Sequence, residues 1–395
     1  MQIMTKNVQA DGPSVSAGAG GFSLLRRHMP ELDVLRGVAV LMVVLYHGFY
    51  WMNRAVYSQP WQTFFVDSTI GGWLGVNLFF ILSGFLITGI LLDSKEKPHY
   101  YRTFYTKRAL RILPALAAAL MLALVFRQTS VAGAWLAIAF LVNYAPALGV
   151  FAYVPLWSLA VEEHFYLLWP TVVHRFRTRT ITAIAVALCI VEPILRGLSR
   201  SLHLGDPHVQ THLVLDYLAS GALLAVFARS RFSSRANSMT LAFILIFAGA
   251  AILAIGAPHR ILHRDNAWGD ALQVEPFNLI FAGTLLLLLT LRLRVFAGPL
   301  FSPMRYLGYI SYGLYLYHLI IFVTGTEILA RWNILQGEGD FPIVVARFLL
   351  LFAVAIVVSA ISRRWLEQPF LNLKSRVTVE GRALKEQVER GGASA

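Results

Sequence analysis

One arginine and one histidine lie within a long apolar stretch near the start of the chain, between residues 34 and 51. They are Arg36 and His47, eleven residues and about 16 Å apart along a helix. Histidine changes its protonation near neutral pH, so His47 could take the proton from a hydroxyl that attacks an electrophilic carbon. Because Tyr46 and Trp51 stand beside it, His47 could instead belong to an aromatic belt at a membrane surface.

Two adjacent carboxylates begin a later apolar stretch. Glu162 and Glu163 follow Trp157-Ser-Leu-Ala-Val and point about 100° apart if this segment is a helix. At most one of them can therefore face a given partner squarely. That carboxylate could orient an imidazole or bind the hydroxyls of a substrate. Alternatively, both acids mark a helix start, where the helix dipole favours negative charge.

Basic residues follow a tyrosine-rich stretch between residues 100 and 105. Arg108 and Arg111 are three residues apart, so they share one face of a helix, and Lys107 precedes them. Paired guanidinium groups suit the phosphates of a nucleotide-type ligand. The alternative is that these residues only supply the positive charge that orients a membrane protein.

A further group of polar side chains could line a cavity between helices. Tyr312, Tyr315 and His318 recur at a spacing of three, which places them on one helix face, although a packed aromatic face would show the same pattern. Other intramembrane acids have a structural interpretation, since Glu192 lies one turn from Arg196 and predicts an ion pair with it. The remaining cavity candidates are Ser83, Asn143 and Tyr166.

Histidine pairs with a spacing of four could suggest zinc. They are His208 with His212 and His259 with His263, but neither pair has the glutamate of an H-E-x-x-H motif or an evident third ligand. The single cysteine gives no thiolate metal site and no disulfide framework. We therefore expect no metal and no permanently bound cofactor.

The composition places these residues in a membrane protein. Of the 395 residues, 57% are hydrophobic and 14% are charged, and the mean hydropathy is +0.61. Segments long enough to cross a bilayer and apolar on every face recur along the chain. The net charge of +13 comes from short basic blocks between these segments, so we expect no nucleic acid partner.

The apolar windows set the expected topology. The window 133 to 146 is short and ends in Asn143 and Pro146, so we expect it to be re-entrant or packed among the other helices. The remaining ten windows then place most of the 34 lysines and arginines on the side that carries both termini, which the positive-inside rule makes cytoplasmic. The eleven windows are 34 to 51, 73 to 92, 109 to 126, 133 to 146, 157 to 174, 180 to 198, 212 to 228, 239 to 257, 274 to 291, 305 to 325 and 342 to 362.

We therefore predict an all-α polytopic membrane protein with about ten transmembrane helices and both termini in the cytoplasm. Residues 1 to 30 are expected to be a disordered cytoplasmic tail, and residues 371 to 395 a second cytoplasmic tail with a solvated or surface-lying helix. The transmembrane domain occupies residues 31 to 370.

Seven motifs, in order, resemble the acyltransferase 3 family of bacterial membrane acyltransferases. They are spread from residue 31 to residue 370 and cover nearly the whole chain except its tails. The motifs are Glu31-Leu-Asp-Val-Leu-Arg-Gly-Val-Ala-Val-Leu-Met-Val-Val-Leu-Tyr-His47, Asn77-Leu-Phe-Phe-Ile-Leu-Ser-Gly-Phe-Leu-Ile87, Arg108-Ala-Leu-Arg-Ile-Leu-Pro114, Trp157-Ser-Leu-Ala-Val-Glu162, Phe165-Tyr166, Ile310-Ser-Tyr-Gly-Leu-Tyr-Leu-Tyr-His318 and Trp365-Leu-Glu-Gln-Pro-Phe370.

The resemblance implies a function and a location. Members of the family transfer acyl groups, most often acetyl, from cytoplasmic acyl-coenzyme A to hydroxyls of envelope polysaccharide, lipopolysaccharide, peptidoglycan or glycolipid. We accordingly expect an O-acyltransferase of the inner cell membrane, with acyl-coenzyme A as co-substrate, a carbohydrate or glycolipid acceptor, and membrane lipid around it.

The same resemblance implies roles for individual residues. Arg36 and His47 match the essential Arg and His pair of the family, and Arg108 and Arg111 match its donor-binding R-x-x-R motif. Glu162 matches the glutamate that follows Trp-Ser-Leu. In place of the Gln or other polar residue of many relatives this chain has His164, a second titratable group near Glu162.

A mechanism follows from these roles. The donor's phosphates would dock on Arg108 and Arg111, and its pantetheine arm would reach outward to His47, with Glu162 orienting the imidazole or the acceptor. Arg36 would hold the donor or neutralise charge along its path. Direct transfer and a transient acyl-histidine both fit these residues.

Two other functions fit parts of the pattern. A membrane transporter would also bury charges at the middle of the bilayer, although it would usually show repeated halves, which this sequence lacks. An enzyme that acylates a cytoplasmic small-molecule sugar would carry the same motifs. Only the side on which the acceptor binds separates that enzyme from an envelope-modifying one.

Overall fold

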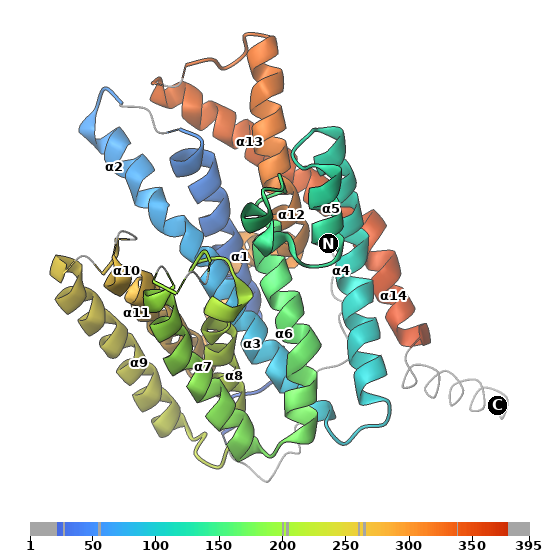
Figure 1. Cartoon of the computed structure of the whole chain (residues 1–395), viewed down its shortest axis with the longest axis vertical. Helices are drawn as coiled ribbons and strands as arrows, with labels where there is room; N and C mark the ends of the chain where they lie inside the picture. Colours follow the sequence, from blue (N-terminus) through green and yellow to red (C-terminus); the bar gives the residue numbers. More distant parts are fainter. Residues whose placement is uncertain are drawn as a thin grey trace.

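The computed structural model describes residues 22 to 377, except residues 27, 54 to 56, 200, 203 to 204, 260, 264 to 265 and 338. Within these residues the secondary structure is helical, with no strand (Figure 1). Most of the two expected tails lies outside the described residues. The part of the second tail that is described, residues 371 to 377, has helical backbone, and the boundaries of both tails stay predictions.

The first half of the chain contains helices α1 to α7. The first helix, α1, passes directly into a π-helical turn, η1, which carries His47. The bounds are α1 Pro30–Leu45, η1 Tyr46–Trp51, α2 Pro60–Ser68, α3 Gly75–Ser94, α4 Tyr100–Val125, α5 Val131–Ile138, α6 Leu156–Arg175 and α7 Thr178–Leu198.

The second half contains the longest helix, α12, and a second π-helical turn, η9, at the end of α13. Short 3-10 turns connect several of the helices. The bounds are α8 Asp216–Ala228, α9 Arg235–Gly256, α10 Ala267–Leu272, α11 Glu275–Leu291, α12 Ser302–Arg331, α13 Phe341–Ile361, η9 Ser362–Glu367 and α14 Gln368–Val377.

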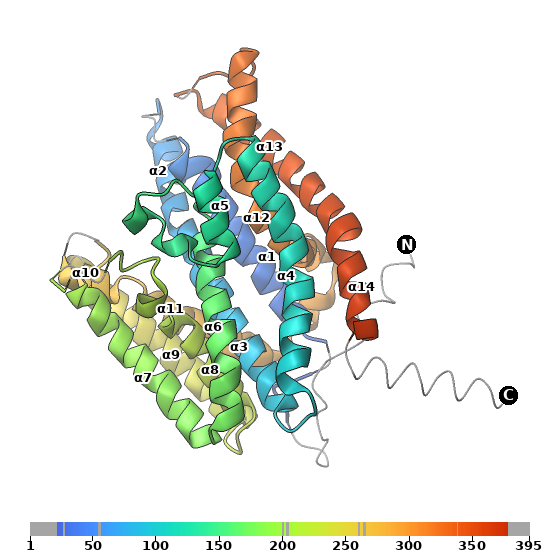
Figure 2. The same ribbon diagram turned by 45° about the vertical axis from the view of Figure 1, so that its right-hand side comes forward.

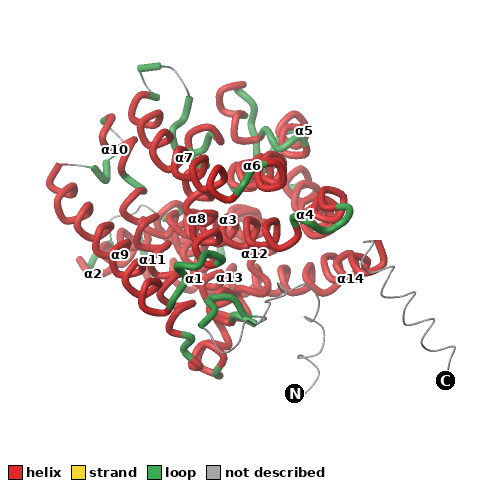
Figure 3. Tube along the Cα trace, turned by 90° about the horizontal axis from the view of Figure 1, so that it is seen from below, coloured by secondary structure: helices red, strands yellow, loops and turns green. Residues whose placement is uncertain are grey.

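The helices form one elongated bundle. In Figures 1 and 2, α7, α8, α9 and α11 gather on one side and α4 and α14 on the other, with α1, α3 and α12 between them. Seen from below in Figure 3, α1, α3, α8 and α12 occupy the middle of the cross-section. The most extensive helix pairs are α9 with α11, α3 with α8 and α1 with α12.

Length and hydropathy agree with a membrane bundle. Eight helical segments of the described chain are long and apolar enough to cross a bilayer, and much of their surface is turned outward. On α9, the side chains of Phe243, Phe247 and Ile255 are exposed, as expected of a lipid-facing surface. The prediction of an all-α polytopic membrane protein is confirmed.

The number of crossings and the side of the termini stay predictions. Two further predicted crossings, windows 157 to 174 and 212 to 228, are helical as α6 and α8. Helix α6 is 20 residues long but carries several polar side chains, and α8 has only 13 residues. The uncertain window 133 to 146 forms the eight-residue α5 and two 3-10 turns. Eight helical residues span about 12 Å, too little to cross a hydrocarbon core.

Glycines let α1 and α12 approach closely. A Cβ atom on Gly37 would overlap the carbonyl oxygen of Met304, and a Cβ on Gly308 would overlap the carbonyl oxygen of Asp33. Each helix thus presents a glycine to the backbone of the other, as in tightly packed membrane helices. The contact fixes the position of α1, and with it that of Arg36 and His47.

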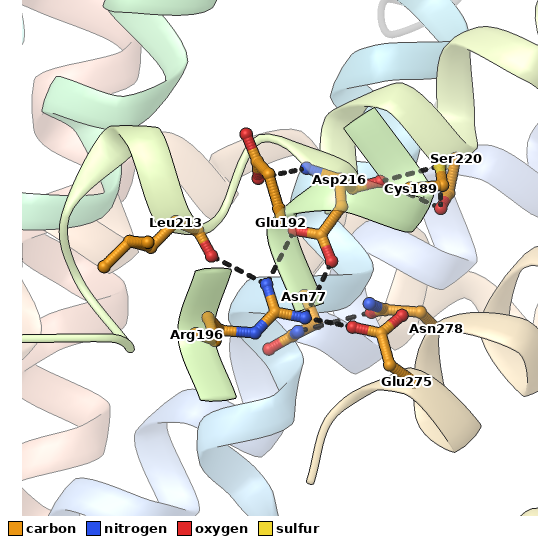
Figure 4. Close-up of polar contacts among 9 residues, drawn as sticks. All are labelled: Asn77, Cys189, Glu192, Arg196, Leu213, Asp216, Ser220, Glu275 and Asn278. Carbon is orange, nitrogen blue, oxygen red and sulfur yellow. Dashed lines mark hydrogen bonds and ion pairs between the residues drawn. The ribbon is translucent and has the colours of Figure 1, made fainter. Parts of the chain in front are cut away.

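A buried ion cluster joins α7, α8 and α11 (Figure 4). The Arg196 guanidinium, which is fully buried, donates to both carboxylate oxygens of Asp216, at 3.0 and 2.9 Å, and also to Glu275. The sequence predicted a pair between Arg196 and Glu192, and this prediction is wrong. Glu192 instead accepts a hydrogen bond of 2.9 Å from the backbone N–H of Asp216, because it faces the first turn of α8.

Replacing Arg196 with methionine is expected to destabilise the bundle strongly. The change leaves the carboxylates of Asp216 and Glu275 without their cation, and loss of one partner from a buried ion pair costs about 3 to 5 kcal/mol. Thermal unfolding in detergent should show a clear drop in Tm for Arg196→Met. The exposed Arg179→Gln should unfold like the wild type. Equal Tm values for all three proteins would contradict a stabilising role for the cluster.

Candidate functional site

A cavity of about 260 Å³ lies among α1, α3, α4, α6 and α12. It brings together residues from five distant parts of the sequence, and its wall combines these polar groups with apolar side chains of α3 and α6. The predicted site residues that line it are Arg36, Ser83, Arg108, Arg111, Glu162, Tyr166, Tyr312 and Tyr315. His47, His318 and Asn143 do not line it.

One part of the cavity is positively charged. Arg108 and Arg111 come from α4, and neither has a carboxylate within 4 Å in the described part of the chain. Arg111 lies within the electrostatic reach of three other guanidinium groups, those of Arg36, Arg108 and Arg363. Arg36 lies 3.7 Å from the carboxylate of Asp33 and also feels the charge of Glu162. Such an excess of guanidinium groups makes this part of the cavity suited to an anion.

Aromatic rings hold Arg108 in place. Its guanidinium carbon lies 5.0 Å from the centre of the Tyr166 ring and 5.8 Å from that of Phe104. Contacts of this kind orient a guanidinium and leave its N–H groups free to donate. Arg108 is thus preorganised to bind an acceptor group such as a phosphate oxygen.

Glu162 faces the cavity from α6. Its carboxylate interacts with the hydroxyls of Ser83 and Tyr166, which also hydrogen bond to each other, and it feels the charges of Arg108 and Arg111. Glu162 is therefore part of the cavity wall on the side of the arginines. Its neighbour Glu163 points elsewhere, as the helical spacing predicted.

His47 and His318 form a pair where α1 meets α12. The Nδ1 atom of His47 lies 3.3 Å from Nε2 of His318 and 2.9 Å from the carbonyl oxygen of Val43. The Nδ1 atom of His318 lies 2.7 Å from the carbonyl oxygen of Tyr315 and 3.1 Å from that of Leu314. His318 is fully buried and His47 is half-buried.

These contacts assign the neutral tautomers. A carbonyl oxygen only accepts, so the Nδ1 atom of each imidazole carries a hydrogen. Nε2 of His318 then has the lone pair that accepts from Nδ1–H of His47. The Nε2 atom of His47 is left with a lone pair and no hydrogen-bond partner among the described residues. That atom can act as a general base.

Tyr315 stands between the cavity and the histidine pair. Its ring lines the cavity and lies 5.8 Å, centre to centre, from the ring of His318. Its hydroxyl bonds to Ser158 at 2.6 Å and to the carbonyl oxygen of Pro155 at 3.0 Å. The cavity and the histidine pair are therefore adjacent regions of one site.

The neighbour of His47 differs from the one that the sequence predicted. We expected Glu162 as a possible partner of the imidazole, but His318 occupies that position. The reason is the packing of α12 along α1, whereas α6 turns Glu162 towards α3 and α4. Binding the acceptor or the donor stays open as a role for Glu162.

Two other candidates lie away from the cavity. Asn143 donates a hydrogen bond of 2.9 Å to the Thr211 hydroxyl, and Nδ1 of His164 lies 2.6 Å from the same hydroxyl. This chain of contacts ties the segment after α5 and helix α6 to the turn before α8. The placement of Asn143 at the cavity was wrong, because its loop packs against residue 211 and not against α3.

The structure adds residues that the sequence did not single out. Ser158 and Ser311 line the cavity, and Arg363 approaches Arg111 from the second π-helical turn. Ser158 lies within the Trp-Ser-Leu motif and could have been noticed there. For Arg363 the charge gave no signal, since basic residues are common at helix ends. In the described residues no group of three or more His, Cys, Asp or Glu side chains is arranged to hold a metal ion.

Comparison with known proteins agrees with this architecture. A family profile described as "Acyltransferase domain" matches residues 29–364. The chain is 27% identical, over 391 residues, to O-acetyltransferase OatA of Staphylococcus aureus (strain NCTC 8325 / PS 47), covering 87% of this chain and 57% of that protein. It is 26% identical, over 385 residues, to peptidoglycan O-acetyltransferase OatA of Listeria monocytogenes, covering 87% and 56%.

The chain thus spans a little over half the length of these two relatives. No solved structure matches it. The family match runs from before Arg36 to beyond His318, so it contains every helix that lines the cavity and both members of the histidine pair. The resemblance to the family is confirmed, and the chain belongs to the acyltransferase 3 family.

Proposed function

We propose that the protein is a membrane O-acetyltransferase that moves an acetyl group from acetyl-coenzyme A to a hydroxyl of an envelope carbohydrate. One observation carries the proposal: a single site has unpaired guanidinium groups at one part and an imidazole with a free lone pair beside it. The guanidinium groups belong to Arg108 and Arg111, and the imidazole to His47.

Several features of the cavity support an acyl-coenzyme A donor. Arg108 and Arg111 would bind the phosphates through charge-assisted hydrogen bonds. The apolar wall formed by residues such as Phe80 and Leu159 would hold the pantetheine arm. A volume of about 260 Å³ lies at the small end of ligand pockets, which favours a short acyl group over a fatty acyl chain.

A carbohydrate acceptor is supported by the relatives, both of which are named as O-acetyltransferases, one of them for peptidoglycan. From the positive-inside rule we expect Arg108 in the cytoplasmic half of the membrane and His47 in the outer half. In that orientation the donor enters from the cytoplasm, and the acceptor hydroxyl approaches His47 from the opposite side.

The acetyl transfer needs the imidazole of His47, the acceptor hydroxyl and the thioester of the donor. Nε2 of His47 takes the proton of the acceptor hydroxyl while its oxygen attacks the thioester carbonyl. The carbon–sulfur bond then breaks, and the proton passes from His47 to the leaving thiolate, which gives an acetyl ester and free coenzyme A. Attack by Nε2 itself on the thioester, which gives an acetyl-imidazole first, uses the same atom and the same two substrates.

The test is transfer of radiolabelled acetyl from acetyl-coenzyme A to an envelope-glycan fraction by protein in lipid vesicles. Wild type should label the glycan, and His47→Ala should lower the rate about 100-fold to 10,000-fold, because a general base contributes that much. A Tm equal to wild type would show that the variant is folded. Wild-type turnover by His47→Ala would exclude His47 as the base, and no transfer by wild type with either peptidoglycan or lipopolysaccharide acceptors would contradict the function.

Replacing both Arg108 and Arg111 with glutamine is expected to weaken donor binding. Each lost hydrogen bond to a charged group is worth about 1.5 to 3 kcal/mol, so the Kd for coenzyme A should rise at least tenfold. Calorimetry in detergent measures the change, and Arg179→Gln, on an exposed part of α7, is the matched control. Equal Kd values would leave the two arginines with a topological role alone.

The role of His318 as hydrogen-bond acceptor for His47 can be tested by two substitutions, one that keeps an acceptor and one that removes it. His318→Gln can place its side-chain oxygen near the former Nε2 and keep an acceptor for Nδ1–H of His47. His318→Leu removes it, so kcat should fall roughly 5-fold to 100-fold, with less loss in His318→Gln. Measurement of kcat and donor KM for both variants would decide, and an equal loss in both would remove the acceptor role from His318.

A further inference from the structure

An arginine is buried in α13, outside the cavity. Arg347 is 7% exposed, and in the described part of the chain no carboxylate pairs with it. A charged side chain within a membrane helix is costly and is usually retained for a function. Arg347 takes no part in the donor site described above, so its role has to be sought in its own contacts.

Arg347 reaches the segment that follows His47. One of its terminal nitrogens donates to the side-chain oxygen of Asn53 at 2.5 Å, across 294 positions of sequence. The other lies 3.4 Å from the carbonyl oxygen of Leu335. The guanidinium therefore joins α13 to the end of the first π-helical turn, η1.

Asn53 in turn closes η1. Its side-chain nitrogen donates to the carbonyl oxygen of Gly48 at 2.7 Å, and its backbone N–H donates to that of Phe49 at 2.9 Å. These carbonyls lie at the end of a helical segment, where intrahelical donors run out. A positive charge beside such carbonyls is also favourable for the helix dipole. Asn53 is itself buried, at 4% exposure.

The turn that these residues hold is unusual and carries His47. A π-helical turn makes hydrogen bonds of wider spacing than an α-helix, is rare, and occurs often at functional sites. His47 is the second residue of η1, so the change from α to π geometry sets the direction of its imidazole. Phe348, which follows Arg347 in α13, packs against the same turn. Its ring centre lies 4.4 Å from that of Phe49, and the ring leaves no room for a side chain at Gly48.

Direct binding of a substrate by Arg347 does not fit the space around it. The cavity beside Arg347 has a volume of only about 10 Å³ and is lined by Gly48, Asn53 and Thr326 among others. A space of this size holds about one water molecule at most. The remaining explanation for the buried charge is that Arg347 holds the segments it contacts in place.

We propose that Arg347 and Asn53 form a clamp that fixes the π-helical turn and thereby aims Nε2 of His47 at the reacting groups. The inference rests on the proposed function, because it assigns His47 the role of base. Arg347 and Asn53 are positioning residues in this scheme. They act on the rate of the chemical step and leave the arginines that bind the donor untouched.

The sharpest variant is Asn53→Asp. It keeps an oxygen for Arg347, now with a full negative charge, but replaces the N–H donor that caps Gly48 with a second oxygen. If the hydrogen bond from Asn53 to the carbonyl oxygen of Gly48 holds the turn, kcat should fall roughly tenfold and the Kd for coenzyme A should not change. Arg347→Met should give a similar loss of kcat, and Ser359→Ala, another buried polar position of α13, should behave like the wild type.

Hydrogen–deuterium exchange gives a second readout that does not need turnover. In Arg347→Met the backbone amides between residues 46 and 53 should exchange faster, while peptides of α4 that carry Arg108 exchange as in wild type. Wild-type kcat in both clamp variants, or unchanged exchange between residues 46 and 53, would overturn the clamp. Loss of donor affinity in parallel with kcat would overturn it too, since it would indicate general damage to the fold.

The two proposals fail in different ways. Absence of acetyl transfer by the wild type would refute the proposed function, and the exchange measurement would still decide whether the clamp exists. Normal transfer by wild type together with normal transfer by Asn53→Asp would refute the clamp alone.

Discussion

Helices α1 and α12 lie backbone against backbone, because on each of them a glycine faces a carbonyl of the other. In a membrane, where burial of apolar side chains from water cannot drive helix association, such close packing is a main source of stability. The contact is also what assembles the site. It places His47 against His318, and it brings Arg36 to the same cavity as Tyr312 and Tyr315.

The arginines of the apolar helices differ in their partners. Arg196 is surrounded by carboxylates that it binds directly, so that cluster is electrostatically complete and joins three helices. In the part of the chain that the structure describes, Arg108 and Arg111 lack such partners and face a cavity. An arginine that has no carboxylate partner and lines a cavity is the better candidate for binding an external anion. This contrast distinguishes the arginine of the ion cluster from the arginines of the cavity without reference to any relative.

Much of the fold could be predicted from the sequence, because long apolar segments indicate helices that can cross a membrane. The cavity residues Arg36, Arg108, Arg111 and Glu162 could also be singled out, since ionisable groups within apolar segments need a reason. Their helices then had to meet for the cavity to form, and the structure brings them together.

Other features depend on packing between distant segments and left no local signal. His318 contacts His47 although 271 positions separate them in the sequence. Arg196 binds Asp216 and Glu275 and not Glu192, which is closer to it in the sequence. Helical periodicity did not indicate that α1 ends in a π-helical turn, because this turn has only six residues, too few to show a change of period.

The central claim is that one site binds the donor's phosphates at Arg108 and Arg111 and presents its acyl group to His47. The most direct measurement is a structure of the protein in lipid with a non-reactive thioether analogue of acetyl-coenzyme A. The account predicts phosphate oxygens within hydrogen-bonding distance of both guanidinium groups and the acyl group past Tyr315, towards Nε2 of His47. An analogue bound elsewhere, with both arginines unoccupied and the acyl group away from His47, would contradict it.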